Sequence, residues 1–215
     1  MRYLLPAMAA FALACASSTS LAAQPQRHRG HARVASHVSL HVSRHSALSG
    51  GRRVVLRGRV RPAGRHRVKL VLRGVGGGVV KTTSRPSGAF AVRWSPKRPG
   101  SYRVRAYGIH DSAVRGSASV SRRLTAYRQA EASYYGPGLY GNGVACGGTL
   151  EPGTLGVASK TLPCGARVTF RYRGRTVTVP VIDRGPYVAG RDFDLTEATK
   201  QRLGFPGVDT LLASR

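Results

Sequence analysis

The chain has 215 residues, of which 41% are hydrophobic, and its 35 Lys and Arg against 8 Asp and Glu give it a formal charge of +27. This length suits one or two globular domains, and so basic a surface attracts polyanions. All seven histidines lie before residue 130. The C-terminal part therefore has no histidine for a Ser-His-Asp, Cys-His or histidine-zinc site, and we expect neither a metal nor a cofactor there.

The first residues have the pattern of a secretory signal peptide. An apolar stretch, residues 4–14, follows one arginine and precedes small residues and then polar chain. We predict a signal peptide over residues 1–23, because the apolar stretch is too short to span a bilayer. A secreted or wall-associated protein follows from this, with lipid anchoring through Cys15 as the alternative. Residues 24–37 are polar, basic and aperiodic, which predicts a linker.

Charge divides the chain into two unlike parts. Residues 1–129 carry twenty-five Lys and Arg and one acid, a formal charge of +24, whereas residues 130–215 carry ten Lys and Arg and seven acids, a charge of +3. For an exported protein, anionic wall polymers are the polyanions at hand. An arginine-rich genome composition explains the charge equally well. Specific nucleic-acid binding is not expected, because no stacking aromatics are interleaved with base-reading residues.

Residues 38–126 have the pattern of a β-sandwich. Seven short runs recur about every ten residues and are separated by Gly and Pro turns, and in SYRVRAY apolar residues alternate with Arg103 and Arg105. This predicts an immunoglobulin-like antiparallel sandwich with a spacing or adhesive role. The runs are SLHVS, VVLRGRV, VKLVLRG, GVVKTT, AFAVRW, YRVRAYG and ASVSRRLTA.

Residues 130–215 predict a small closed barrel. RVTFRYRGRTVTVPVID has the alternation of a hairpin turning at Arg173-Gly174, LTEATKQRLG predicts one helix from Thr196 to Gly204, and VDTLLAS predicts a closing strand. Cys146 and Cys164 are the two cysteines of the folded part, and an even pair in an exported protein predicts a disulfide.

Half of the carboxylates of the chain fall within VIDRGPYVAGRDFDLTE, residues 181–197. Without histidine, carboxylates are the acid–base groups available here, which favours glycan chemistry. A structural role is the alternative for each acid. Asp183 would organise a turn beside Arg184, and Asp194 would cap the helix. Asp192 and Glu197 are expected to be solvated.

The C-terminal part resembles the rare lipoprotein A family of double-psi β-barrel proteins. The motifs that carry the resemblance are A-S-x-Y-G at 132–136, T-L-P-x-G at 161–165, D-R-G-P-Y at 183–187 and F-D-L-T at 193–196. The resemblance covers residues 131–215. It implies a six-stranded double-psi barrel that binds peptidoglycan, acting as a lytic transglycosylase that cleaves the MurNAc-GlcNAc β-1,4 bond and leaves a 1,6-anhydro end.

The resemblance also implies roles for individual residues. Asp183 matches the catalytic aspartate and Asp194 the second acid that the barrel shares with expansins. Six more residues are expected to contact the substrate. Arg184 and Tyr187 would do so by charge or hydroxyl and Tyr134 and Tyr135 by stacking on sugar rings, and Glu151 and Ser159 complete the set.

Two positions depart from the family pattern. Gly148 stands where the family has a glutamate, and Ser159 stands where it has a histidine, with Glu151 as the nearest substitute carboxylate. A non-catalytic, expansin-like peptidoglycan binder is therefore the second hypothesis. A secreted partner-binding or protease-inhibiting barrel is the third. In each case we expect a monomer.

Overall fold

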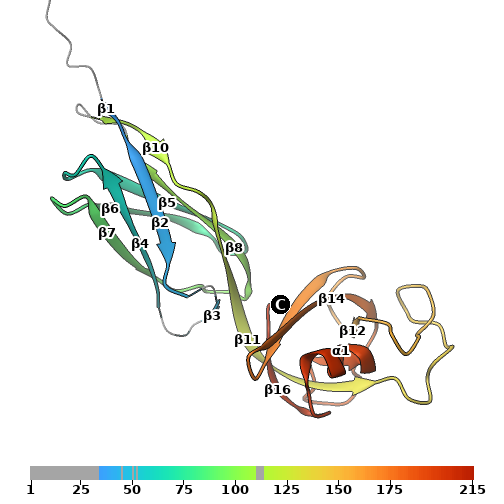
Figure 1. Cartoon of the computed structure of the whole chain (residues 1–215). Helices are drawn as coiled ribbons and strands as arrows, with labels where there is room; N and C mark the ends of the chain where they lie inside the picture. Colours follow the sequence, from blue (N-terminus) through green and yellow to red (C-terminus); the bar gives the residue numbers. More distant parts are fainter. Residues whose placement is uncertain (1–33, 45, 50, 52, 110–113) are drawn as a thin grey trace, which may run out of the picture. The chain divides into compact units, whose positions relative to one another are not determined.

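The computed structural model of the chain describes residues 34–44, 46–49, 51, 53–109 and 114–215 (Figure 1). The predicted signal peptide and Cys15 lie outside these residues. The described chain is mainly β, and α1 (Glu197–Leu203) is the one α-helix in it. Within the same residues, no helix has the length and apolar character needed to cross a membrane.

The first part of the described chain forms two antiparallel sheets. The three-stranded sheet has the order β2-β4-β7, and the second runs β6-β5-β8-β11, with β10 paired to β8 and β3 joined in parallel to β11. Their bounds are β2 (His37–Val42), β3 (Ser46–Leu48), β4 (Val54–Arg61), β5 (Arg67–Arg73), β6 (Gly78–Thr83), β7 (Ala89–Trp94), β8 (Gly100–Gly108), β10 (Ser117–Ala118) and β11 (Arg122–Tyr135).

Both sheets contribute to one core because their strands alternate between buried and exposed side chains. On β8, Tyr102, Val104 and Ala106 are fully buried while Arg103 and Arg105 are exposed, as the sequence predicted. Leu56 of β4 and Leu70 of β5 lie in the same core cluster. Each of the seven predicted runs contains a strand, and the last of them is divided between β10 and β11.

The predicted linker over residues 24–37 is shorter than expected at its C-terminal end. β1 (Val34–Ala35) pairs in parallel with β9 (Val114–Arg115), and β2 begins at His37. β2 alternates exposed and buried residues from its first position, so the sheet pattern starts inside the predicted linker. Two-residue strands carry too little periodicity to be found in a sequence, which is why β1 and β9 were missed.

The second part is a closed barrel of six strands. Neighbouring strands follow the order β15-β12-β14-β13-β16-β11, and a pairing of β11 with β15 closes the ring. Two of these pairs, β11 with β15 and β12 with β14, are parallel. The new strands are β12 (Val157–Ala158), β13 (Arg167–Tyr172), β14 (Arg175–Asp183), β15 (Phe193–Thr196) and β16 (Asp209–Ala213).

The hairpin, helix and closing strand of the barrel agree with the sequence prediction. Arg173 and Gly174 turn between β13 and β14 with φ of 43° and 87°, the two positive values that a tight two-residue hairpin needs. The side chain of Thr196 caps α1 by accepting a hydrogen bond from the Thr199 N–H, and Gly204 ends the helix in the left-handed conformation.

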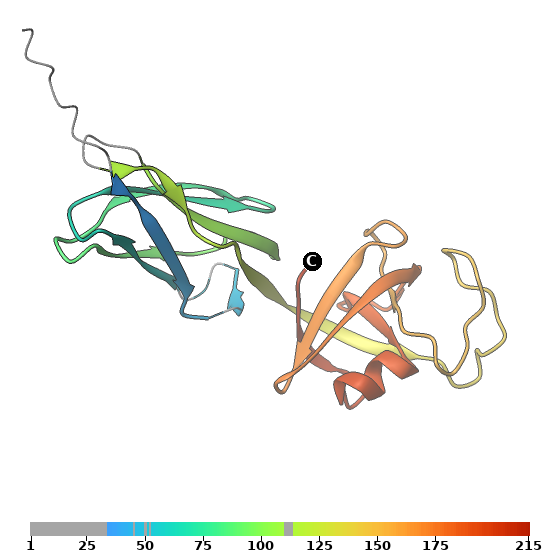
Figure 2. The same cartoon turned by 45° about the horizontal axis from the view of Figure 1, so that its top comes forward.

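β11 is shared by both parts of the chain. Its first half pairs with β8, and its second half pairs with β16 and β15. In Figure 2 the strand continues without a break as its colour changes from green to yellow. The sequence placed a boundary between residues 126 and 130, but these residues lie inside a fourteen-residue strand.

Candidate functional site

A row of four residues crosses four neighbouring strands of the barrel. Ser133 of β11 is opposite Asp194 of β15, which is opposite Ala158 of β12, which is opposite Asp183 of β14. Ser133 and Asp194 are opposite one another in a regular ladder and project to the same face. The pairing of β12 with β14 shifts register between Val157 and Ala158, so a β-bulge immediately precedes Asp183. The two aspartates are two strands apart, about 10 Å between backbones, and both act on the phenol of Tyr135.

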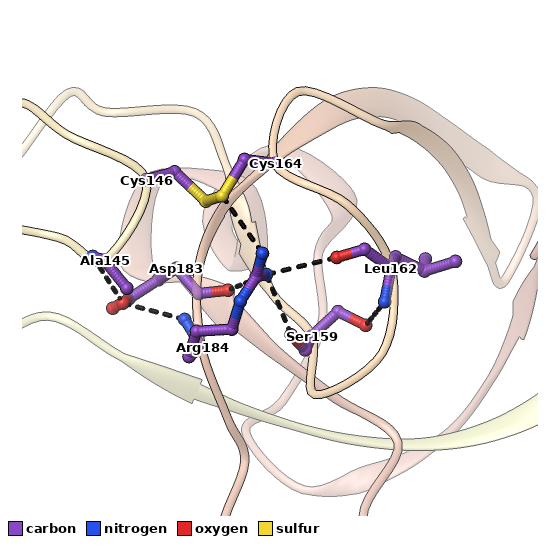
Figure 3. The surroundings of a disulfide bond; sticks show 7 residues. All are labelled: Ala145, Cys146, Ser159, Leu162, Cys164, Asp183 and Arg184. Carbon is purple, nitrogen blue, oxygen red and sulfur yellow. Dashed lines mark hydrogen bonds between the residues drawn. A yellow bond between two sulfur atoms is a disulfide. The ribbon is translucent and has the colours of Figure 1, made fainter.

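Asp183 is held by two backbone N–H groups. Its Oδ1 accepts hydrogen bonds from Ala145 over 2.9 Å and from Arg184 over 2.8 Å (Figure 3). Both of these bonds fall on Oδ1, so Oδ2 is the oxygen left to act on a substrate. Asp183 ends β14 and is half-buried, which suits a carboxylate that must be both positioned and accessible.

The predicted disulfide between Cys146 and Cys164 is present, with Cα atoms 5.5 Å apart. The N–H of Cys146 also donates to the carbonyl of Ile182 over 3.0 Å. The disulfide and this bond fix the segment that carries Ala145 against the end of β14. The disulfide therefore contributes directly to the position of Asp183.

Asp194 is paired with Ser133, whose hydroxyl donates to Asp194 Oδ1. The sequence offered helix capping as the alternative role for Asp194, and this is wrong because Thr196 is the N-cap of α1. Ser133 is buried, so the hydrogen bond is shielded from water. Ser133 is the serine of the A-S-x-Y-G motif, and its pairing with Asp194 was not predicted from the sequence.

Tyr135 lies two positions after Ser133 on the same face of β11, which brings its ring to the two aspartates. Its hydroxyl is buried, and no hydrogen bond of normal geometry joins it to a residue that the structure describes. Burial is the main cause that raises the pKa of Tyr135 far above its usual value, and the nearby carboxylates of Asp183 and Asp194 add to the shift. The phenol therefore stays protonated at neutral pH and can donate a hydrogen bond.

Arg184 turns away from the acids and towards the loop that precedes β13. Its Nη1 donates to the carbonyls of Ser159 and Leu162 over 3.2 and 3.1 Å, and its Nη2 lies 3.1 Å from Cys164 Sγ. The carbonyl of Asp183 accepts the Ser159 N–H, and the Ser159 hydroxyl accepts the Leu162 N–H at 3.3 Å. Arg184 and Ser159 are thus engaged in holding this loop, as Figure 3 shows.

Three of the predicted substrate contacts lie apart from the row of acids. Tyr134 is on the opposite face of β11, with the Lys200 ammonium 3.9 Å from its ring centre. Glu151 is exposed in a turn with Thr154, and the Tyr187 side chain is 83% exposed beyond the Gly185-Pro186 turn. Of the predicted substrate contacts, Tyr135 is the one whose pKa both aspartates raise.

The expectation that Glu197 is solvated is wrong, because its side chain is 15% exposed, whereas the Asp192 side chain is 37% exposed and is solvated while also making contacts. Asp192 forms an ion pair with Arg128 at 3.0 Å and accepts the Glu131 N–H. Glu197 is half-buried and accepts from Gln201 over 2.9 Å and from Lys200 over 3.5 Å. Both acids are engaged in the barrel structure, because a carboxylate at a strand end or in a first helical turn finds donors nearby.

The arrangement can supply general acid–base chemistry. A carboxylate with one free oxygen can give and take a proton, and a phenol that stays neutral can hold a hydroxyl or glycosidic oxygen by donating to it. Gly148, at the position of the family glutamate, has φ of +90°, and the space that a Cβ would occupy there has no atom within 4 Å. An L-residue at this position would be strained by its backbone rather than by lack of space.

Comparison with known proteins agrees with the closed six-stranded ring. Residues 128–211 match the family described as "Lytic transglycolase", a double-psi β-barrel family. This part of the chain is therefore a double-psi β-barrel. More particularly, the chain is similar to proteins named RlpA, several of which match it at 35–45% identity.

Two of these relatives show the extent of the match. The "Endolytic peptidoglycan transglycosylase RlpA" of Neisseria meningitidis is 35% identical over 111 residues, which is 47% of this chain and 46% of that protein. The protein of the same name from Yersinia pestis is 45% identical over 74 residues, 34% of this chain and 21% of that one. The chain thus spans less than half the length of these relatives. Among solved structures, Streptomyces papain inhibitor matches at 27% identity with a TM-score of 0.34, over 41% of this chain and 92% of that one.

Proposed function

We propose that the barrel is a peptidoglycan lytic transglycosylase in which Asp183 is both acid and base. Protonated Asp183 gives its proton to the glycosidic oxygen as the MurNAc-GlcNAc bond breaks. The resulting carboxylate then takes the proton of the MurNAc C6 hydroxyl, whose oxygen attacks C1 and closes the 1,6-anhydro ring. One carboxyl group serves both steps, and no water enters.

The observation that carries this proposal is the fixed position of Asp183 opposite Ala158, with Asp194 on the other side of the same residue. Two backbone donors orient its Oδ1, and the neutral Tyr135 phenol lies beside it. Asp194, paired with Ser133, supplies a second negative charge that favours the oxocarbenium-like transition state. The names of the matched relatives support the same activity.

A second function is favoured by Gly148 and Ser159. The φ of Gly148 disfavours the family glutamate, and the Ser159 hydroxyl is engaged with Leu162. A barrel without these two groups would bind glycan strands through the same face without cutting them, as expansins do. Peptidoglycan is the partner in both proposals.

The test is to incubate the protein with peptidoglycan and to search for 1,6-anhydromuropeptides by mass spectrometry. We expect them with the wild type and not with Asp183→Asn. Asp192→Asn is the matched control, because this acid is engaged with Arg128 outside the row. Absence of anhydro products together with sedimentation on the wall would establish the binder instead. Wall binding that survives Asp183→Ala with Asp194→Ala would mean that glycan binds elsewhere.

For the preceding part we propose an immunoglobulin-like sandwich over residues 38–126, followed by the barrel domain over residues 130–215. The strand order β2-β4-β7 against β6-β5-β8-β11 supports it, since seven strands in this arrangement are typical of the fold. So does Tyr102 near the start of β8, whose hydroxyl donates to the Arg98 carbonyl over 2.7 Å. A tyrosine bonded to the backbone a few residues upstream is a hallmark of such sandwiches.

Export is part of the same proposal. We expect a secreted or wall-associated monomer whose first residue follows Ala22 or Ala23. Mass spectrometry of the protein recovered from the producing cells measures this directly. A chain that starts at Cys15 with a lipid mass would instead establish the anchored form.

A further inference from the structure

The outward face of the sheet β6-β5-β8-β11 carries a dense group of cations, which we call the arginine face. Its positions alternate with buried core residues along each strand, so their side chains project away from the core. Its cations are Lys69, Arg73, Lys81, Arg103, Arg105 and Arg123.

Three of these arginines stand in one row across three strands. Arg73 of β5 is opposite Arg103 of β8, which is opposite Arg123 of β11. Like charges directly opposite one another destabilise a sheet. No Asp or Glu occurs among the described residues before Glu131. This part of the described chain therefore contributes no carboxylate to the arginine face.

The face is also shaped to receive a ligand. A depression of about 280 Å³ is lined by Arg73, Arg103 and Arg123 together with Gly74 and Ser101. A smaller one of about 140 Å³ adjoins it along β8, where Arg73 and Arg103 again contribute, now with Arg105 and Tyr107. Arg73 and Arg103 line both depressions, so guanidinium groups border each of them.

The spacing of the cations defines the kind of anion. The Cα atoms of neighbours in the row are about 5 Å apart across the strands, and those of Arg103 and Arg105 are about 7 Å apart along β8. Anions on so close a spacing are found in polymers that carry a charge on every short repeat. Guanidinium groups bind the paired oxygens of phosphate in a bidentate way. A polymer with one carboxylate per disaccharide would leave cations unmatched.

The aromatic content of the face argues against nucleic acid. Tyr107 lies on it, half-buried, with Lys69 Nζ and Arg105 Cζ at 5.7 and 5.6 Å from its ring centre. Both cations cover the ring, and binding of single strands relies on open aromatic rings on which bases stack. We infer that the arginine face binds a linear phosphodiester polymer without bases, such as an alternating polyol–phosphate chain of the cell wall.

The experiment measures binding of the full chain to poly(glycerol phosphate) at about 150 mM salt, where long-range attraction is largely screened. The variant Arg73→Gln/Arg103→Gln/Arg123→Gln should lose affinity about tenfold or more, because three close phosphate contacts are removed. The matched control is Arg57→Gln/Arg59→Gln/Arg93→Gln, which removes the same charge from exposed positions of β4 and β7. The control should change affinity by about twofold at most.

Several results would overturn the inference. Equal losses in the two variants would mean that net charge alone attracts the polymer. Equally tight binding of single-stranded DNA, with the same dependence on the row, would make this a nucleic-acid surface. Equally tight binding of polygalacturonate would show that phosphate is not selected. Asp183→Asn should leave polyol–phosphate binding unchanged, so this test is independent of the proposed activity of the barrel. Thermal unfolding of both triple variants checks that each is folded.

Discussion

Ala145 donates its backbone N–H to Oδ1 of Asp183 over 2.9 Å, and the residue that follows Ala145 is half of a disulfide. The covalent bond therefore lies one residue from the group that orients the proposed catalytic carboxylate. Cys146 and Cys164 are 18 residues apart, and neither contacts the substrate in the mechanism proposed above. Removing both cysteines therefore tests two effects of the disulfide, one on the stability of the barrel and one on the position of Asp183.

We predict that Cys146→Ser/Cys164→Ser lowers the free energy of unfolding by about 3 kcal/mol, the stabilisation of a closed loop of this length. Denaturant unfolding of the wild type with and without reductant measures the same quantity. Anhydromuropeptide formation should fall further than the loss of folded protein explains, because Ala145 is no longer fixed against Asp183. Full activity in the folded double variant would mean that the Ala145 segment is held by its other hydrogen bonds.

Tyr135→Phe tests the phenol between the aspartates. We expect stability at neutral pH to be unchanged or raised by about 1 kcal/mol, because the variant removes a buried hydroxyl without a partner. Activity should fall if the phenol donates to the sugar. A variant with full activity would leave Tyr135 only a packing role.

The pH dependence of the stability of the same variant follows from the direction in which folding shifts the pKa of Tyr135. The pKa of Tyr135 is raised in the folded protein, mainly by burial, so above the ordinary value of about 10 the unfolded chain loses a proton that the folded chain keeps. Wild-type stability should therefore decline with rising pH there, and Tyr135→Phe should decline less. Urea midpoints of the two proteins at pH 8 and pH 11 measure the difference, which should be larger at pH 11.

Tyr102→Phe tests the proposed immunoglobulin-like corner. It removes the hydrogen bonds to the Arg98 and Val75 carbonyls, leaves the ring packed edge-on against Trp94, and should cost about 1–2 kcal/mol of unfolding free energy. Tyr107→Phe, on the solvent side of the same strand, is the control and should cost less. Equal small effects would show that the corner does not stabilise this sandwich.

Gly148→Glu restores the residue type of the family but not its backbone. At φ of +90° we expect a loss of about 1–3 kcal/mol in the stability of the loop. Gly148→Asn should lose less, since asparagine tolerates positive φ better than glutamate. Thermal unfolding compares the two. Glutamate tolerated as well as asparagine would show that the loop can adopt another conformation at this position.

Much of the fold could be predicted because its periodicity is strong. The alternation in residues 102–106 and the Arg173-Gly174 turn each specify a local structure, and Thr196 with Gly204 brackets the helix. The pairing of Ser133 with Asp194, and of both aspartates with Ala158, depends on strands far apart in the chain. No local pattern specifies such long-range register, so the residues around each aspartate were missed.

Arg184 is a second residue whose contacts could not be predicted from the sequence. A cation next to Asp183 was expected to reach the substrate, but three backbone carbonyls and a sulfur lie within its reach. Backbone carbonyl groups cannot be recognised as a sequence motif, since every residue has one. Only the path of the chain decides which of them converge on a guanidinium group.

The fourteen residues of β11 also have a consequence for protease resistance. A protease requires several residues in an extended form free of ladder hydrogen bonds, and here Thr125 and Ala126 are bonded to β8 while Arg128 to Ala132 are bonded to β16. Only Tyr127 separates these two ladders, and β3 pairs with it. Limited digestion should therefore trim other segments before it separates the two halves, and a chain cut at residues 126–130 would break a strand that both cores share.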